Sequence, residues 1–125
     1  MDKKLAFVIE DEPDLATIFS EALRSVGFET KVITFGDVAL EELQTSIPAV
    51  VVLDLHLPHI SGTEVLKQIR ADERLSETQV IVATADAALA ESIEVNADLV
   101  LLKPISFLQL RTLAERLKTF PNQSE

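Results

Sequence analysis

Short apolar runs alternate with longer amphipathic segments along almost the whole chain, and this alternation limits the available folds more than any other feature of the sequence. A run that is apolar at every position is typical of a strand buried on both faces of a parallel sheet. The runs predicted as strands are Leu5–Ile9, Thr30–Phe35, Ala49–Leu53, Gln79–Thr84 and Leu99–Leu102. The second run is half polar, so we expect it at an edge of the sheet.

A segment with apolar residues at helical spacing follows each predicted strand. The segments predicted as helices are Leu15–Val26, Asp37–Leu43, a stretch after Gly62 that contains Val65, Leu66 and Ile69, Ala87–Val95, and Phe107–Leu117. Strict alternation of strand and helix predicts an α/β fold in which helices cover both faces of a parallel sheet. Right-handed crossovers favour a flavodoxin-like, doubly wound five-stranded sheet with the strand order 2-1-3-4-5.

Length and composition indicate a single domain and exclude several classes of protein. We assign residues 1–120 of the 125-residue chain to one domain and residues 121–125 to a tail or the start of a linker. The formal net charge of −10 argues against nucleic-acid binding, which needs a basic surface. The absence of cysteine excludes disulfides and thiolate chemistry. Because no apolar run approaches the ~20 residues of a membrane span, we expect a cytoplasmic domain without membrane contact.

Polar side chains follow four of the five predicted strands, at the edge where sheets of this kind bind ligands. Glu10, Asp11 and Glu12 follow the first strand, Asp54 follows the third and Lys103 the fifth, and Thr84 ends the fourth. Crowded carboxylates repel one another, and a hard cation such as Mg²⁺ relieves that repulsion. A lysine and a hydroxyl can contact phosphoryl oxygens. The combination predicts Mg²⁺-dependent phosphoryl transfer onto a carboxylate.

Each of these residues also has an ordinary structural explanation when it is considered alone. Asp11 or Glu12 could cap the following helix, Asp54 could belong to a turn, and Lys103 could be a solvated surface lysine. Their occurrence together, at the ends of strands that meet at one edge of the sheet, favours a functional site.

Four segments, in order along the chain, resemble the sequence blocks of the response-regulator receiver domain of two-component signalling, the family that includes chemotaxis regulators. The segments are Phe7–Leu15, Leu53–Gly62, Val82–Ala85 and Asn96–Pro104. The resemblance extends from about Leu5 to Leu117. Any one block would be a weak signal, whereas four in the correct order are specific.

The resemblance implies that Asp54 accepts a phosphoryl group from a phosphohistidine of a sensor histidine kinase or a phosphotransfer protein. It implies that Glu10, Asp11, Asp54 and the backbone carbonyl of His56 bind Mg²⁺, and that Lys103 contacts the phosphoryl oxygens. Such a domain is a signalling phosphoprotein rather than an enzyme, because its only chemistry is its own phosphorylation and dephosphorylation. A homodimer is a further partner that the sequence leaves open.

The resemblance further implies a two-state switch. Thr84 turns toward the phosphoryl group and draws in the loop before the fourth helix, which shifts an existing conformational equilibrium. A cis peptide bond is implied between Lys103 and Pro104. Val100 occupies the position, three residues before the lysine, where the family often has an aromatic switch residue, so the mode of output differs here. Glu10 stands where Asp is commoner.

Two further positions are those at which the family tunes the loss of phosphate. His56 lies two residues after Asp54, and Asp86 lies two residues after Thr84. We hypothesise that both side chains border the route of the hydrolytic water and set the lifetime of the phosphorylated state.

Three alternatives stay open at the level of the sequence. A Mg²⁺-dependent phosphohydrolase with an aspartate nucleophile usually carries that residue after the first strand with another Asp two residues on, whereas Asp54 follows the third strand and precedes His56 by two. A flavin- or nucleotide-binding module is disfavoured by the scarcity of glycine and the lack of Trp and Tyr. A pseudo-receiver that binds a partner without phosphorylation is disfavoured by the complete set of acidic residues, Thr84 and Lys103.

Overall fold

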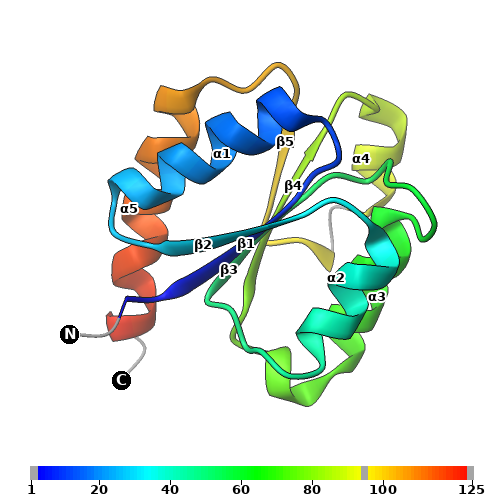
Figure 1. Cartoon of the computed structure of the whole chain (residues 1–125), viewed down its shortest axis with the longest axis horizontal. Coiled ribbons are helices and arrows are strands. Elements are labelled where there is room, and N and C mark those ends of the chain that lie inside the picture. The colour runs from blue at the N-terminus through cyan, green and yellow to red at the C-terminus, as the bar shows by residue number, and fades with distance from the viewer. Residues whose placement is uncertain (1–2, 94–95, 124–125) are drawn as a thin grey trace.

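Strands and helices alternate through residues 3–93 and 96–123, which are the residues that the computed structural model describes (Figure 1). The strands are β1 (Leu5–Ile9), β2 (Glu29–Ile33), β3 (Val50–Leu53), β4 (Gln79–Thr84) and β5 (Leu99–Leu102). The helices are α1 (Pro13–Ser25), α2 (Gly36–Leu43), α3 (Gly62–Ala71), α4 (Ala87–Ile93) and α5 (Phe107–Gln123). A short 3₁₀ helix, η1 (Glu73–Leu75), follows α3 and is not predicted by the sequence pattern.

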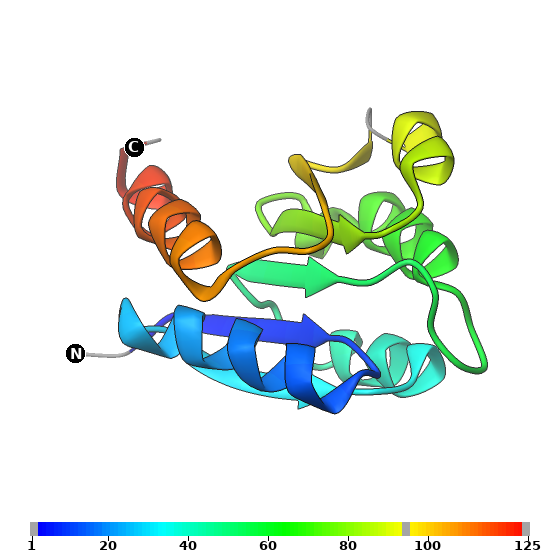
Figure 2. The same ribbon diagram turned by 90° about the horizontal axis from the view of Figure 1, so that it is seen from above.

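The strands form one parallel sheet with the order β2-β1-β3-β4-β5. Figure 2 shows the arrowheads of β1, β3 and β4 pointing in the same direction. The predicted α/β class and strand order are therefore confirmed. The half-polar strand β2 lies at an edge of the sheet, as its composition predicts.

Helices cover both faces of the sheet and enclose two apolar cores. Helices α1 and α5 lie together on one face, where Phe19 and Leu110 pack with Val8 of β1 (Figure 1). Helices α2, α3 and α4 cover the other face, where Leu66 packs with Phe7. Phe7 and Val8 serve different cores because successive residues of a strand point to opposite faces.

Local sequence explains where α1 begins and ends. Pro13 stands at the start of the helix, where its missing N–H costs nothing. The side chain of Glu12 caps the helix by accepting the backbone N–H of Leu15 at 3.0 Å. At the other end, Gly27 has a φ of 100°, a conformation that only glycine adopts at low cost.

Two helix ends differ from the predicted ones or cannot be compared with them. Helix α4 is predicted to reach Val95, but residues 94–95 lie outside the described part of the chain. Helix α5 runs to Gln123 and thus continues past Leu117 into the segment predicted as a tail. The division of the chain at residue 120 stays a prediction.

The length and hydropathy of the helices bear on whether the chain could cross a membrane. Among the described residues, no helix is both long enough and apolar enough to span a bilayer.

Candidate functional site

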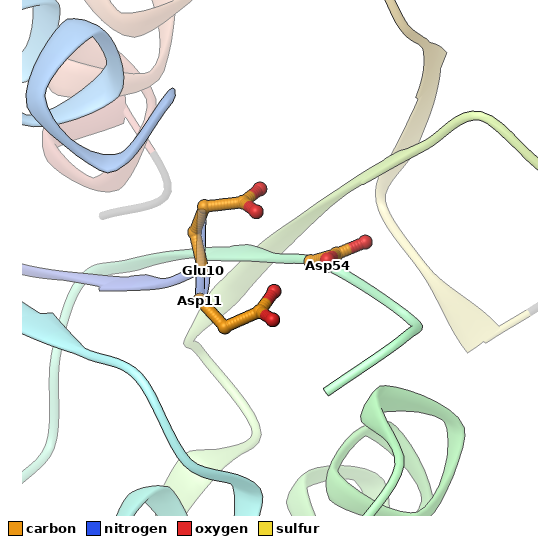
Figure 3. A group of neighbouring side chains, drawn as sticks. All are labelled: Glu10, Asp11 and Asp54. Atoms are coloured by element: carbon orange, nitrogen blue, oxygen red, sulfur yellow. The ribbon is translucent and has the colours of Figure 1, made fainter. Parts of the chain in front are cut away.

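Three carboxylates meet at the carboxyl ends of β1 and β3. Glu10 and Asp11 extend from the end of β1 toward Asp54, which follows β3 (Figure 3). One oxygen of each carboxylate lies within 4.8 Å of the others. The two strands are neighbours, and the backbone N–H of Asp54 continues their pairing by donating to the carbonyl of Ile9 at 3.0 Å. The parallel register therefore brings together acids that are far apart in the sequence.

Lys103 reaches this acidic cluster from the end of β5. Its Nζ lies 3.0 Å from Oε1 of Glu10 and 3.6 Å from Oδ1 of Asp54. The backbone N–H of Lys103 donates to the carbonyl of Thr84 at 2.8 Å, so the pairing of β5 with β4 sets where the lysine leaves the sheet. Its side chain is 16% exposed, which means that the ammonium faces the carboxylates rather than open solvent.

The charge at the site is unbalanced. Glu10 is 1% exposed, and this burial raises its pKa, an effect that the hydrogen bond from Lys103 opposes and the nearby charge of Asp54 reinforces. One ammonium lies beside a cluster of three carboxylates, and the side-chain atoms of this cluster that could bind a metal ion are all carboxylate oxygens. Oxygen donors of this kind suit Mg²⁺, which typically takes one or two carboxylates and keeps several waters. The donor set thus fits the predicted metal.

His56 and Glu12 lie next to the acidic residues in the sequence, and the structure gives each of them a hydrogen bond. The backbone N–H of His56 donates to Oδ1 of Asp54 at 3.4 Å, so His56 lies directly beside the acid. Its carbonyl stays a predicted ligand. Glu12, the third acid after β1, is not part of the cluster, because its carboxylate caps α1.

Thr84 ends β4 with a fully buried side chain. Its hydroxyl oxygen accepts the backbone N–H of Asp86 at 3.1 Å. The structure therefore places Thr84 at the same edge of the sheet as the acidic cluster, with its hydrogen bond directed to the loop that leads into α4.

His56 and Asp86, which follow β3 and β4, contact each other through their side chains. Nε2 of His56 lies 3.2 Å from Oδ2 of Asp86, and their side chains are 65% and 39% exposed. Asp86 also caps α4 by accepting the backbone N–H of Leu89 at 3.0 Å. This backbone hydrogen bond, followed by the contact with His56, lowers the pKa of Asp86. The contact joins the β3–α3 loop to the start of α4.

Val100 and Pro104 complete the predicted residues. Val100, in β5, is partly buried against the core beneath α2, α3 and α4 and shares that core with Leu89 of α4. The peptide bond between Lys103 and Pro104 is cis.

The sequence did not predict two groups of interacting side chains that do not include Glu10, Asp11 or Asp54. The rings of Phe35 and His59 stack at a centroid distance of 4.7 Å, and Nδ1 of His59 lies 3.1 Å from Oδ1 of Asp37. Arg70 binds Asp98 at 2.7 Å. Each cluster joins residues more than 20 positions apart in the chain, and no local pattern indicates such a contact.

Comparison with known proteins agrees with this geometry. The sequence model of the response regulator receiver domain matches residues 6–115. The chain belongs to this family, as the four sequence blocks indicate.

Named relatives support the assignment. The sensory transduction protein RegX3 of Mycobacterium tuberculosis is 37% identical over 103 residues, which are 82% of this chain and 45% of RegX3. The probable methanogenesis regulatory protein FilR2 of Methanothrix harundinacea is 32% identical over 130 residues, covering 95% of this chain and 84% of FilR2. This chain thus spans less than half of RegX3 and most of FilR2.

Solved structures share the fold. The signal receiver domain of a LuxO repressor protein from Vibrio parahaemolyticus superposes with a TM-score of 0.84 at 27% identity, with 99% of each chain covered. The whole described architecture, and not only the acidic edge, is therefore that of a receiver domain. The family match favours this class over the phosphohydrolase and the nucleotide-binding module.

Proposed function

We propose that this receiver domain accepts a phosphoryl group on Asp54 and changes conformation when it does so. The observation that carries the proposal is the position of the Lys103 ammonium, 3.0 Å from Glu10 and 3.6 Å from Asp54. A carboxylate nucleophile beside a fixed positive charge suits the transfer of a phosphoryl group, whose charge lies on its oxygens.

The reaction has a simple balance of bonds. An oxygen of Asp54 forms a bond to phosphorus while the bond from phosphorus to the donor nitrogen of a phosphohistidine breaks, leaving an acyl phosphate on Asp54 and a neutral histidine on the donor. Lys103 stabilises the phosphoryl oxygens. Glu10, Asp11, Asp54 and the carbonyl of His56 would hold Mg²⁺, which would supply positive charge to offset the repulsion between the carboxylates and an incoming phosphoryl group.

The switch starts at Thr84. At rest its hydroxyl oxygen accepts one hydrogen bond from Asp86, and the hydroxyl hydrogen is available to be donated. When phosphate arrives, Thr84 turns and donates to a phosphoryl oxygen, and its bond to the loop before α4 is rearranged. Val100 has no ring to rotate, so the β4–α4 loop and α4 carry the change to the surface.

His56 and Asp86 set how long the phosphoryl group lasts. What supports this is their contact at 3.2 Å, which joins the residue two positions after Asp54 to the residue two positions after Thr84. The pair therefore slows hydrolysis of the acyl phosphate without taking part in its formation.

The partner is a sensor histidine kinase or a phosphotransfer protein, as membership of the receiver family supports. The domain signals rather than turning over a substrate, acts in the cytoplasm and can form a homodimer. Nucleic acid is not a partner of this domain, because the net charge of −10 disfavours contact with phosphates.

The decisive experiment is incubation with acetyl phosphate and Mg²⁺, followed by intact mass measurement, with Asp54→Asn as the control. We expect one added phosphoryl group that is absent from the variant and absent without Mg²⁺. An unchanged mass would indicate a pseudo-receiver and overturn the proposal, as would an equal gain by Asp54→Asn. Continuous release of phosphate from a general phosphate ester would instead support the phosphohydrolase.

A further inference from the structure

Arg70, in the last turn of α3, binds three acceptors on two other segments of the chain. Its Nε donates to the carbonyl of Asn96 at 2.7 Å, Nη1 to the carbonyl of Thr78 at 3.2 Å, and Nη2 to Oδ2 of Asp98 at 2.7 Å. The side chain is only 26% exposed. A planar guanidinium that satisfies three acceptors at once holds them in one fixed arrangement.

Asp98 extends this network into the sheet. Its Oδ2 also accepts the backbone N–H of Val80 at 2.7 Å, and its own N–H donates to the carbonyl of Val80 at 2.9 Å. Asp98 directly precedes β5, so these bonds begin the pairing of β5 with β4. Arg70, Asp98 and Val80 therefore fix the point at which the chain returns from α4 into the sheet.

The two ends of the segment between β4 and β5 are held very differently. The end near the acidic cluster is held by the hydrogen bond from Asp86 to the Thr84 hydroxyl and by the contact between His56 and Asp86, whose side chains are 65% and 39% exposed. The end at residues 96–98 is held by the Arg70 network at the opposite edge of the sheet. Exposed ion pairs contribute little, whereas a partly buried guanidinium with several charge-assisted bonds contributes more.

We propose that Arg70 is a positioning residue for the switch, and that α4 moves about the end held by Arg70 when Asp54 is phosphorylated. This inference rests on the proposed function, because it needs a phosphoryl-driven movement to guide. Arg70 acts through Asn96 and Asp98, and none of its hydrogen bonds involves the acidic cluster of Glu10, Asp11 and Asp54. It thereby limits the conformational change to the β4–α4 loop and α4, while β5, which leads to Lys103, keeps its place.

The test is hydrogen exchange of the full chain, measured by mass spectrometry before and after phosphorylation with acetyl phosphate and Mg²⁺. Arg70→Gln is compared with Arg74→Gln. Arg74 is a matched control because its guanidinium also binds a backbone carbonyl, that of Leu43 at 2.6 Å, and a carboxylate, that of Asp72 at 2.9 Å, but none of its hydrogen bonds reaches residues 96–98.

We expect phosphorylation of the unmodified chain and of Arg74→Gln to change exchange in residues 85–92 and to leave residues 96–102 unaltered. In Arg70→Gln, exchange of residues 96–102 increases by about tenfold at rest, since local opening becomes easier, and phosphorylation then changes it further. The rate of phosphorylation stays within about twofold, because the acidic cluster lies at the other edge of the sheet. Arg70→Lys keeps the positive charge but cannot make the same three hydrogen bonds, so we expect exchange of residues 96–102 between that of the unmodified chain and that of Arg70→Gln.

Several results would overturn the proposal. Equal exchange of residues 96–102 in Arg70→Gln and Arg74→Gln would show that Arg70 holds nothing that Arg74 does not. A change that reaches residues 96–102 on phosphorylation of the unmodified chain would show that this end is not a pivot. Failure of Asp54 to gain mass would refute the proposed function, and the pivot with it, whereas normal mass gain with unchanged exchange would refute the pivot alone.

A second variant covers the case in which Arg70→Gln does not fold. Asp98→Asn leaves Arg70 its two backbone acceptors and removes only the charge of the third. We expect the same redistribution of exchange to residues 96–102, smaller than in Arg70→Gln. Exchange identical to that of the unmodified chain would count against the proposal.

Discussion

The carboxyl ends and the amino ends of the parallel strands, here called the carboxyl edge and the amino edge of the sheet, differ in how their charges are arranged. At the carboxyl edge, three carboxylates face one ammonium, and Glu10 is buried although burial raises its pKa. At the amino edge, the guanidinium of Arg70 is matched by three acceptors, and the buried hydroxyl of Thr78 donates to the carbonyl of Pro48 at 2.7 Å. The carboxyl edge keeps an excess of negative charge, whereas at the amino edge the polar side chains of Arg70, Asp98 and Thr78 each have hydrogen-bond partners.

This difference indicates which edge of the sheet is weakened by charge repulsion and which is made rigid by hydrogen bonds. Crowded like charges weaken the folded state unless a cation joins them, so a bound cation would stabilise the acidic cluster. Buried polar groups that are fully paired rigidify their surroundings. The amino edge can therefore stay fixed while the carboxyl edge responds to a ligand.

The largest expected effect comes from removing the ammonium of Lys103, which contacts Glu10 and Asp54 of the acidic cluster. Lys103→Met should slow phosphorylation by acetyl phosphate by on the order of 100-fold, because a fixed donor to the phosphoryl oxygens is lost. Rates from intact mass against time measure this. The control is Lys31→Met, which removes an exposed lysine that pairs with Glu42 at 2.8 Å and should leave the rate unchanged. Equal rates in the two variants would contradict the role given to Lys103.

The next effect tests how closely the backbone packs beneath the site. A Cβ at Gly62 would lie 2.0 Å from the carbonyl oxygen of Asp54, so Gly62→Ala should lower the free energy of unfolding by about 3 kcal/mol. Urea denaturation measures the loss. Gly27→Ala, at a φ of 100° near the amino edge, should cost only about 1 kcal/mol. A smaller loss at Gly62 than at Gly27 would show that the loop can move aside.

A substitution at the amino edge should separate stability from function. Thr78→Val keeps the shape of a side chain that is 2% exposed and removes its bond to Pro48, which should cost about 1 kcal/mol in the free energy of unfolding. The phosphorylation rate should not change. Thr45→Val is the control, because the hydroxyl of Thr45 is exposed and its hydrogen bond to Glu42 is long, at 3.4 Å. A slower phosphorylation rate in Thr78→Val would mean that the two edges are not independent.

A smaller effect is expected where the carboxyl edge meets solvent. His56→Ala and Asp86→Ala should each speed the loss of phosphate by about threefold, because an exposed pair of this kind is worth up to about 1 kcal/mol. The decay of the phosphorylated mass after removal of acetyl phosphate measures this. His59→Ala is the control, since His59 pairs with Asp37 instead. Unchanged decay in both variants would discard the hypothesis that this pair sets the lifetime.

The smallest effect concerns pH. The hydrogen bond to His59 lowers the pKa of Asp37. Desolvation raises it by less, so the pKa stays below its ordinary value. A group whose pKa is lowered by folding stabilises the fold above its unfolded pKa, and this contribution is lost as pH falls through the folded pKa. Asp37→Asn should therefore lower the melting temperature near neutral pH, and the difference should disappear in acid.

The pH prediction has an internal control. In a His59→Gln background, the main cause of the lowered pKa of Asp37 is gone. The pH-dependent effect of Asp37→Asn on the melting temperature should then be much smaller, because only the backbone hydrogen bonds of Asp37 and Val38 still lower the pKa. A pH-dependent difference that persists undiminished in this background would assign the shift to another group.

Much of the fold could be predicted from local pattern. Continuous apolar runs such as that of β3 indicate strands buried on both faces, and strict alternation with amphipathic helices leaves few topologies. Gln79–Thr84 and Leu99–Leu102 are predicted with their observed bounds. The length of α5 and the presence of η1 were not predictable in this way, because neither depends on an apolar period.

The candidate site was predictable in composition but not in detail. Strand ends carry Glu10, Asp54 and Lys103, and parallel strands bring their ends to one edge. The same pattern could not assign Glu12 to a helix cap rather than to the acidic cluster. It also gave no sign that His56 contacts Asp86, because that contact depends on the paths of two loops.

The order of apolar and polar residues alone determined that this chain forms a parallel α/β sheet and that acids and a lysine follow its strands, because burial and strand direction are properties of local runs. Only the tertiary structure decided which of those groups face one another, and that Arg70 holds residues 96–98 from another element. Hydrogen bonds and ion pairs act over a few ångströms, and distances of that size between remote segments exist only once the helices have packed on the sheet.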